Sequence, residues 1–244
     1  MYIHNRLGMI EGVETMLAQE RRLDQVANNL ANVDTAGYKK DSVTFWEMLY
    51  QANAERQRVG KALNVLTDHQ QGHVDPTGNP LDLAIHGEGF FRIQTDQGIR
   101  YSRAGSFELD PMGQLRTPEG GLVLGDGGPI VVDGENFAVE RDGRVLVDGV
   151  LVNQLEVVGV NDLTQLIKEG RNLFRLAPEG EEVPLEAMNF QVRQGFLEKS
   201  NVNSMEEMTI MIDLQRNYEA QQKMIQAVDD MDDQAISRVG RFNR

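Results

Sequence analysis

The chain has 244 residues, of which 40 % are hydrophobic, with a formal net charge of −14 and a sequence pI of about 4.7. These values are typical of a folded chain with one large or two smaller domains, and they exclude wholesale disorder. The acidic balance argues against binding nucleic acid or anionic lipid, and the absence of cysteine excludes disulfides, thiolate catalysis and cysteine zinc sites.

The first residues, MYIHNRLGMIEGVE, lack the basic region and long apolar run of a cleaved signal peptide. No stretch approaches the roughly 20 apolar residues of a membrane-spanning helix. We therefore expect no cleaved signal and no direct membrane insertion. A substrate of a signal-independent export machine has the same pattern.

A helix is predicted over residues 5–33, because apolar residues recur there at alternating spacings of three and four. The run from Asn32 to Gly37 combines Asn, Asp and Gly, which end helices and turn the chain. Glu20 is the one polar residue in this apolar seam. The predicted seam residues are Met9, Val13, Met16, Leu23, Ala27 and Leu30.

Residues 37–80 are predicted to form an extended connector, and residues 81–195 a β-rich middle domain of short strands and hairpins. Asp142-Gly143 and Asp148-Gly149 are strong hairpin signals, because both residue types adopt the positive φ that tight hairpin turns require. Residues 110–113, Asp-Pro-Met-Gly, predict a type I turn. Many short strands at this spacing indicate a sandwich or a barrel-like unit.

A second helix is predicted over residues 203–237, capped by Asn203 or Ser204. Its length of roughly 50 Å suits a coiled coil better than a compact domain. Its predicted seam residues are Met211, Leu214, Tyr218, Ile225 and Val228.

The predicted fold class is α+β, with long N- and C-terminal helices pairing as a coiled-coil-like helical part and a β-rich middle domain. The helices pair either with each other or with helices of neighbouring chains. The expected segments are 1–36, N-terminal helical; 37–80, connector; 81–195, β-rich; and 196–244, C-terminal helical.

Several motifs could in principle bind a metal ion or a phosphate, but their sequence context favours ordinary structural roles. His69 and His73 with Asp75 have helix-like spacing for a metal pair, but Gly72 and Pro76 argue against a helix there. The glycine-rich stretches 87–89 and 125–128 lack the lysine of a phosphate-binding loop and are predicted to be turns with positive φ. The acidic residues Asp229, Asp230, Asp232 and Asp233 lack the spacing of a calcium loop. We predict no catalytic residue, no metal, no cofactor and no enzymatic activity.

Three asparagines near the end of the first helix are poor helix formers. They either cap the helix end or hydrogen-bond across subunits and fix register, and we favour the second interpretation. They are Asn28, Asn29 and Asn32.

Residues 23–40, LDQVANNLANVDTAGYKK, resemble the N-terminal signature of the flagellar rod and hook proteins. Residues 195–208 and 215–223 resemble the C-terminal signature of that family, and residues 79–91 resemble the entry into its β-domain. The three motifs occur in the family's order. The motif residues are Asn28, Asn29, Asn32, Gly37, Tyr38, Ser200, Asn201, Val202, Glu207, Arg216 and Lys223.

The resemblance to the flagellar basal-body rod protein family implies a structural subunit of the bacterial flagellar rod, which self-assembles through its terminal helices and transmits torque from motor to hook. It also implies a place in the basal body across the periplasm, export by the flagellar type III apparatus, and assembly with copies of itself and neighbouring rod proteins. Length and residues 75–80 favour the proximal-rod form over the distal-rod form. The alternative from another class is a soluble ligand-binding module with an intramolecular coiled coil.

Overall fold

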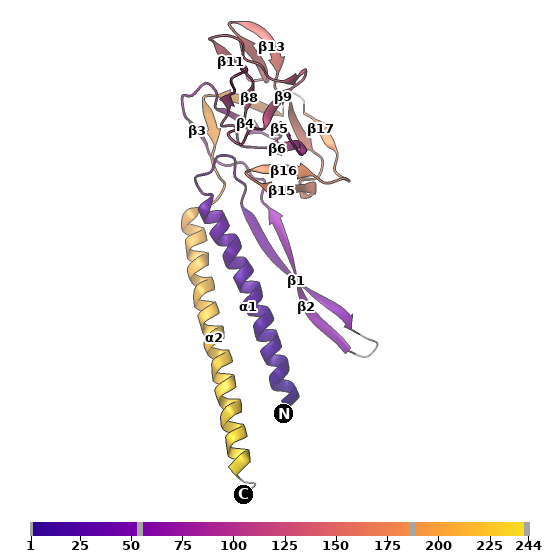
Figure 1. Cartoon of the computed structure of the whole chain (residues 1–244), viewed down its shortest axis with the longest axis vertical. Helices are drawn as coiled ribbons and strands as arrows, with labels where there is room; N and C mark the ends of the chain where they lie inside the picture. Colours follow the sequence, from indigo (N-terminus) through magenta and orange to yellow (C-terminus); the bar gives the residue numbers. More distant parts are fainter. Residues whose placement is uncertain (1, 53–55, 186–188, 242–244) are drawn as a thin grey trace. The chain divides into compact units, whose positions relative to one another are not determined.

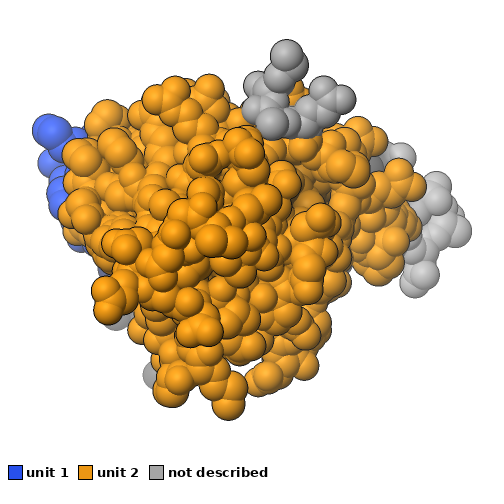
Figure 2. Space-filling view, turned by 90° about the horizontal axis from the view of Figure 1, so that it is seen from above, with its two compact units in different colours: residues 1–31, 41–66, 203–244 blue, residues 32–40, 67–202 orange. Residues whose placement is uncertain are grey.

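The computed structural model describes residues 2–52, 56–185 and 189–241 (Figure 1). The chain divides into two compact units, which Figure 2 shows in different colours. Unit 1 comprises residues 1–31, 41–66 and 203–244, and unit 2 comprises residues 32–40 and 67–202. Each unit is therefore assembled from segments that lie far apart in the sequence.

Unit 1 contains helices α1 (Tyr2–Ala31) and α2 (Ser204–Arg241) and the paired strands β1 (Asp41–Ala52) and β2 (Arg56–Thr67). The helices lie side by side (Figure 1) and antiparallel, because Asn29 contacts Glu207 whereas a Cβ at Gly12 would lie 3.6 Å from Ile225 Cδ1. The N-terminus of α2 has the predicted asparagine cap. Asn203 Oδ1 accepts a 3.2 Å hydrogen bond from the Met205 amide, which satisfies a donor at the helix start.

The predicted fold class is wrong in its helical part. The described residues form nineteen strands and two α-helices, without a long coiled-coil pairing. In a coiled coil the seam positions of both helices are buried against the partner helix. Here Val13 is 47 % exposed and Tyr218 is 37 % exposed, whereas Val26, outside the predicted seam, is buried. Both helices also carry exposed apolar residues outside the predicted seams, Leu17 on α1 and Met208 and Ile212 on α2.

Unit 2 is built almost entirely from short strands and turns, with one 3₁₀ turn, η1 (Leu163–Gln165). The strand bounds are β3 Val74–Pro76, β4 Leu83–Gly87, β5 Phe90–Thr95, β6 Gly98–Ser102, β7 Glu108–Leu109, β8 Leu115–Arg116, β9 Leu122–Gly125, β10 Gly128–Pro129, β11 Phe137–Val139, β12 Arg144–Val147, β13 Val150–Gln154, β14 Val157–Val160, β15 Leu166–Gly170, β16 Leu173–Leu176, β17 Glu182–Pro184, β18 Phe190–Gln194 and β19 Phe196–Glu198.

The largest sheet has the strand order β15-β16-β6-β5-β9-β8-β7, and β10, β14 and β17 join it from the side. A three-stranded sheet, β11-β12-β13, and two strand pairs, β18-β4 and β19-β3, complete unit 2. The pair β19-β3 is antiparallel and sets Glu198 opposite Val74. It brings the end of the middle region back to its beginning.

The predicted tight turns are confirmed. Strands β11 and β12 pair antiparallel around Asp142-Gly143, and β12 and β13 pair around Asp148-Gly149, where both turn residues have positive φ. At residues 110–113 the Gly113 amide donates to the Asp110 carbonyl at 2.9 Å. These turns depend on local sequence alone, which explains why the pattern identified them.

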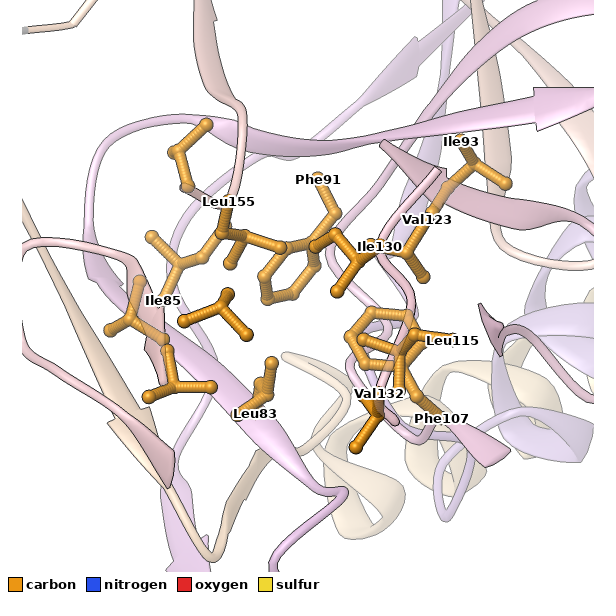
Figure 3. Packing of buried hydrophobic residues seen from close by; sticks show 14 of the residues in the cluster. Leu83, Ile85, Phe91, Ile93, Phe107, Leu115, Val123, Ile130, Val132 and Leu155 are labelled. Carbon is orange, nitrogen blue, oxygen red and sulfur yellow. The ribbon is translucent and has the colours of Figure 1, made fainter. Parts of the chain in front are cut away.

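The core of unit 2 is a cluster of buried aliphatic and aromatic side chains from several strands (Figure 3). Leu83 and Ile85 of β4 are fully buried, as are Phe91 and Ile93 of β5, and the Phe91 ring meets Phe107 edge-on at 5.2 Å between centroids. A second cluster comprises Phe90, Tyr101, Val158, Leu166 and Phe174. Both lie within unit 2, so this unit has its own hydrophobic core. Within the described residues, neither α-helix has an apolar stretch suited to crossing a membrane.

Candidate functional site

The segment that follows α1 and the segment that precedes α2 lie against each other in unit 2. The Gly37 amide donates to the Glu198 carbonyl at 2.7 Å, and the Lys40 amide donates to Asn201 Oδ1 at 2.7 Å. Asn201 Nδ2 also donates to the carbonyl of Asp68 at 2.8 Å, which ties in a third segment. We call residues 36–40, 68–72 and 196–202 the motif junction, because it unites the N- and C-terminal family motifs.

A buried ion cluster lies at the centre of the motif junction. Lys39 Nζ lies 2.6 Å from Glu198 Oε1, and both side chains are fully buried. The second carboxylate oxygen of Glu198 lies 3.4 Å from an Arg103 nitrogen. Lys39 Nζ also donates to the Gln70 carbonyl at 2.6 Å, and the Gly72 amide donates to Glu198 Oε1 at 3.0 Å. One carboxylate therefore organises two cations and a backbone amide.

The electrostatics of this cluster are governed by burial. Removal from water disfavours the charged form, and burial lowers the pKa of Lys39 and of Arg103, while the Glu198 carboxylate opposes both shifts. Arg103 gains further contacts, a 2.8 Å hydrogen bond to the Gly87 carbonyl and a position 5.2 Å from the centroid of the Phe90 ring. A buried cluster of this kind holds segments in one arrangement, since losing one member leaves an unpaired buried charge.

Gly37 occupies a position that only glycine fits. Its φ is +67°, which side chains rarely adopt, and a methyl group there would lie 2.2 Å from the Ala104 nitrogen. Tyr38, the next residue, is 3 % exposed, and Lys168 Nζ lies 3.8 Å from the centroid of its ring. Lys168 Nζ also donates to the Lys39 carbonyl at 2.7 Å. All three residues of the Gly-Tyr-Lys sequence are thus buried.

In the C-terminal motif, Val202 is buried and its amide donates to the Ser200 hydroxyl at 3.2 Å. These contacts shape the turn that leads to the Asn203 cap. Ser200, Asn201 and Val202 therefore have roles in chain geometry within this one polypeptide.

Asn29 forms the polar centre of unit 1. It is fully buried, its amide nitrogen donates to the Asp41 carbonyl at 2.9 Å, and its oxygen accepts from the Asp41 amide at 3.0 Å. The same nitrogen lies 3.4 Å from Glu207 Oε2, and Glu207 is 3 % exposed. Asn29 therefore joins α1, β1 and α2 inside one chain. Asn28 is exposed, and Asn32 lies just past the helix end, where its carbonyl accepts from the Thr35 amide.

The predicted seam residues differ in burial. Leu214 is buried, and Met16, Leu23, Leu30, Met211, Ile225 and Val228 are half-buried. Val13, Ala27 and Tyr218 are exposed, as are the motif residues Arg216 and Lys223. The side chain of Met9 lies outside the described part of the chain. Whether these residues contact neighbouring subunits stays a prediction.

The two histidines of the predicted metal-like motif have separate contacts with other residues. His69 meets the rings of Phe90 and Phe174, with centroids 5.8 and 5.3 Å away, and His73 is an exposed partner of Asp75 at 3.1 Å. Over the described residues, no group of three potential ligands is gathered closely enough for a metal ion. In the acidic run, the side chains of Asp232 and Asp233 lie outside the described part.

The sequence interpretation missed Lys39, Glu198 and Arg103, which form the centre of the motif junction. Lys39 and Glu198 were visible only as charged members of the two terminal motifs. The available signal was the position of Glu198 in an apolar strand, Phe196–Glu198, where a charged residue needs a buried partner.

Three family models match the chain in the order of its motifs. Residues 11–39 match the model described as flagella basal body rod protein, and residues 84–147 match the flagellar hook protein FlgE/F/G D1 domain. Residues 193–238 match the C-terminal model of the flagellar basal body rod FlgEFG proteins. The resemblance stated from the sequence motifs is confirmed.

Full-length relatives give the same result. The chain is 34 % identical to the flagellar basal-body rod protein FlgF of Caulobacter vibrioides, over 95 % of this chain and 97 % of that protein. It is 33 % identical to the rod protein FlgG of Bacillus subtilis, over 91 % and 95 % of the two chains. The flagellar hook-basal body complex protein FlhO of Bacillus subtilis is 32 % identical over 96 % and 99 %. These alignments span both units.

Proposed function

The chain belongs to the family of flagellar basal-body rod proteins, and on that premise we propose that it is a proximal-rod subunit of the FlgF type. It is a structural subunit of the bacterial flagellar basal-body rod. The observation that carries the finer assignment is the FlgF alignment, which leaves only 5 % of this chain and 3 % of the relative outside it. The length of the chain and residues 75–80 also favour the proximal form.

We propose a mechanical role without catalysis. The motif junction fixes residues 36–40, which follow α1, against residues 196–202, which precede α2. A subunit that transmits torque needs a body that keeps one arrangement under load, and the buried ion cluster holds these two segments of unit 2 together. The terminal helices then bind neighbouring subunits, as the family resemblance implies.

We further propose that the flagellar type III apparatus exports the chain. Cells with an inactivated export apparatus should retain the chain in the cytoplasm, whereas cells with a working apparatus should place it in basal bodies. Immunodetection in both fractions measures this. Equal amounts in the basal-body fraction of both strains would contradict the proposal.

A distal-rod role of the FlgG type is the second candidate, favoured by the 33 % identity to the Bacillus subtilis FlgG. The soluble binding module proposed as an alternative depended on an intramolecular coiled coil, and the residues that the structure describes form no long coiled-coil pairing. In cells without the subunit, loss of a proximal subunit and loss of a distal subunit should leave rods that stop at different points.

The decisive experiment is electron microscopy of basal bodies from cells lacking the gene, with motility scored in parallel. A proximal subunit should leave rods that stop close to the membrane, and the intact gene should restore them. Rods that stop late would support the FlgG type. Complete rods and normal motility would overturn the rod assignment.

A further inference from the structure

Helix α1 carries a second stripe of residues that points away from its contacts with α2. Its members recur at spacings of four and three, which places them on one face of a helix, and all are exposed. Two of them are large and apolar, with Val13 47 % and Leu17 53 % exposed. We call this set the α1 outer stripe: Val13, Leu17, Glu20, Asp24, Ala27 and Ala31.

Helix α2 carries a comparable exposed stripe. Met205 is 79 % exposed, and Met208 and Ile212 are each 50 % exposed, at spacings of three and four. Toward the C-terminus the same face continues with Arg216, Glu219 and Lys223, all exposed. We call these six residues the α2 outer stripe. It begins with apolar residues and ends with two cations around one carboxylate.

The two outer stripes cannot meet within one chain. Helices α1 and α2 of one copy contact each other through other residues, Asn29 with Glu207 and Gly12 with Ile225. The buried residue Leu214 lies on that inner side of α2, about half a turn around the helix from the stripe. Each stripe is therefore available to a second molecule.

The stripes are complementary when α2 of one copy lies antiparallel along α1 of another. With Arg216 opposite Asp24, the level of Ile212 is within about one residue's rise of Ala27, which is about 1.5 Å. In this register the level of Met208 is also within about one residue's rise of Ala31. Large apolar side chains thus face small ones, the arrangement that close helix packing favours.

The same register pairs the charges. Glu219 falls at the level of Arg21, an exposed neighbour of the α1 outer stripe, and one residue from Glu20. The level of Glu20 lies between those of Arg216 and Lys223, so two cations flank the two glutamates. The Lys223 stem lies over Leu17 while its ammonium group stays in water. Antiparallel docking is also the orientation that copies of equal polarity require, because α1 and α2 are antiparallel within each copy.

We propose that the α1 outer stripe is the docking site for the α2 outer stripe of a second copy of this chain. The contact is heterologous, so each copy keeps one free stripe of each kind and the assembly continues as an open helix. This inference rests on the proposed function and adds the residues and the register of the contact between copies.

Cysteine cross-linking tests the contact directly, because the natural chain has no cysteine. Two variants, Ala27→Cys and Ile212→Cys, are co-expressed in cells lacking the chromosomal gene, and isolated basal bodies are oxidised. We expect a cross-linked dimer of the two variants. Arg22→Cys is the matched control, since Arg22 is exposed but lies on another side of α1. Equal cross-linking of Ile212→Cys with both partners, or with neither, would overturn the proposal.

Charge reversal separates this proposal from the rod assignment itself. Arg216→Glu and Asp24→Arg should each deplete complete rods and motility, and the double variant should restore both. If the double variant is as defective as the single ones, or if the single ones have no effect, the stripe pairing is wrong. Failure of the rod assignment looks different, because cells lacking the whole gene would then build complete rods.

Discussion

Lys39 and Glu198 form a fully buried ion pair at 2.6 Å although they lie 159 residues apart in the sequence. Lys39 belongs to the N-terminal family motif and Glu198 to the C-terminal one. The pair therefore joins the segment that follows α1 to the segment that precedes α2. Arg103, from the loop that follows β6, joins the same carboxylate.

Replacing Glu198 by glutamine should destabilise unit 2 by about 3–5 kcal/mol, because it leaves two buried cations without a carboxylate. Urea unfolding followed by far-UV circular dichroism measures the change. Lys199→Met is the control, since Lys199 forms an exposed pair with Asp75 at 2.9 Å and its loss should have little effect. Equal midpoints for wild type and Glu198→Gln would contradict a stabilising role of the cluster.

Replacing Gly37 by alanine should destabilise unit 2 far more than replacing Gly78. Both glycines have positive φ, +67° and +77°, so both substitutions carry the backbone penalty of about 1 kcal/mol. Only at Gly37 does the new methyl group collide, 2.2 Å from the backbone nitrogen of Ala104, whereas Gly78 has open space around it. Unfolding midpoints of the two variants measure the difference. Similar midpoints would show that the backbone around Gly37 yields easily.

The sequence predicted those parts of the structure that depend on neighbouring residues. The turns at Asp142-Gly143 and Asp148-Gly149 and the Asn203 cap follow from local conformational preference. The end of α1 was predicted from the same kind of signal, the Asn, Asp and Gly that follow it.

The ion cluster could not be predicted in this way. A pairing between residues 39 and 198 depends on how the whole of unit 2 folds, and charged residues are usually exposed. The coiled-coil pairing of the two helices was wrongly predicted for another reason. Helix α1 contacts β1 as well as α2, through Asn29 and the Asp41 backbone, so its buried face is wider than one coiled-coil seam. A spacing of three and four does not tell which of two adjacent faces is buried.

Stability should fall as the pH rises above about 10, in a way that depends on Tyr101. Its hydroxyl donates to a Glu182 carboxylate oxygen, and burial together with that carboxylate raises the pKa of Tyr101 above its ordinary value of 10.0. The unfolded chain therefore loses this proton first, and the stabilisation present below pH 10 decreases as the pH rises toward the folded-state pKa.

Denaturant unfolding at pH 9, 10 and 11 measures this alkaline loss. In Tyr101→Phe the component due to the phenol should be absent, and Glu182→Gln should reduce it by removing the negative neighbour. An unchanged alkaline slope in Tyr101→Phe would assign the loss to other groups.

Replacing Asn29 by aspartate should open unit 1 while unit 2 stays folded. The new carboxylate would replace the amide that donates to the Asp41 carbonyl, and it would face Glu207 Oε2 at a buried site where the present separation is 3.4 Å. Two buried carboxylates repel each other, and the carbonyl loses its donor, so we expect a loss of about 2 kcal/mol or more. Hydrogen exchange followed by mass spectrometry should show faster exchange at the end of α1 and the start of α2, with unchanged protection in β4 and β5.

The matched control is Asn28→Asp, which makes the same chemical change one residue earlier at an exposed position. It should leave exchange in both units at the wild-type level. Faster exchange in β4 and β5 of Asn29→Asp would mean that the two units unfold together. Equal exchange in the two variants would mean that the Asn29 contacts do not hold the helices. The assembly readout adds a further distinction, because Asn29→Asp should also abolish rod formation if the α1 and α2 outer stripes need a fixed spacing to dock.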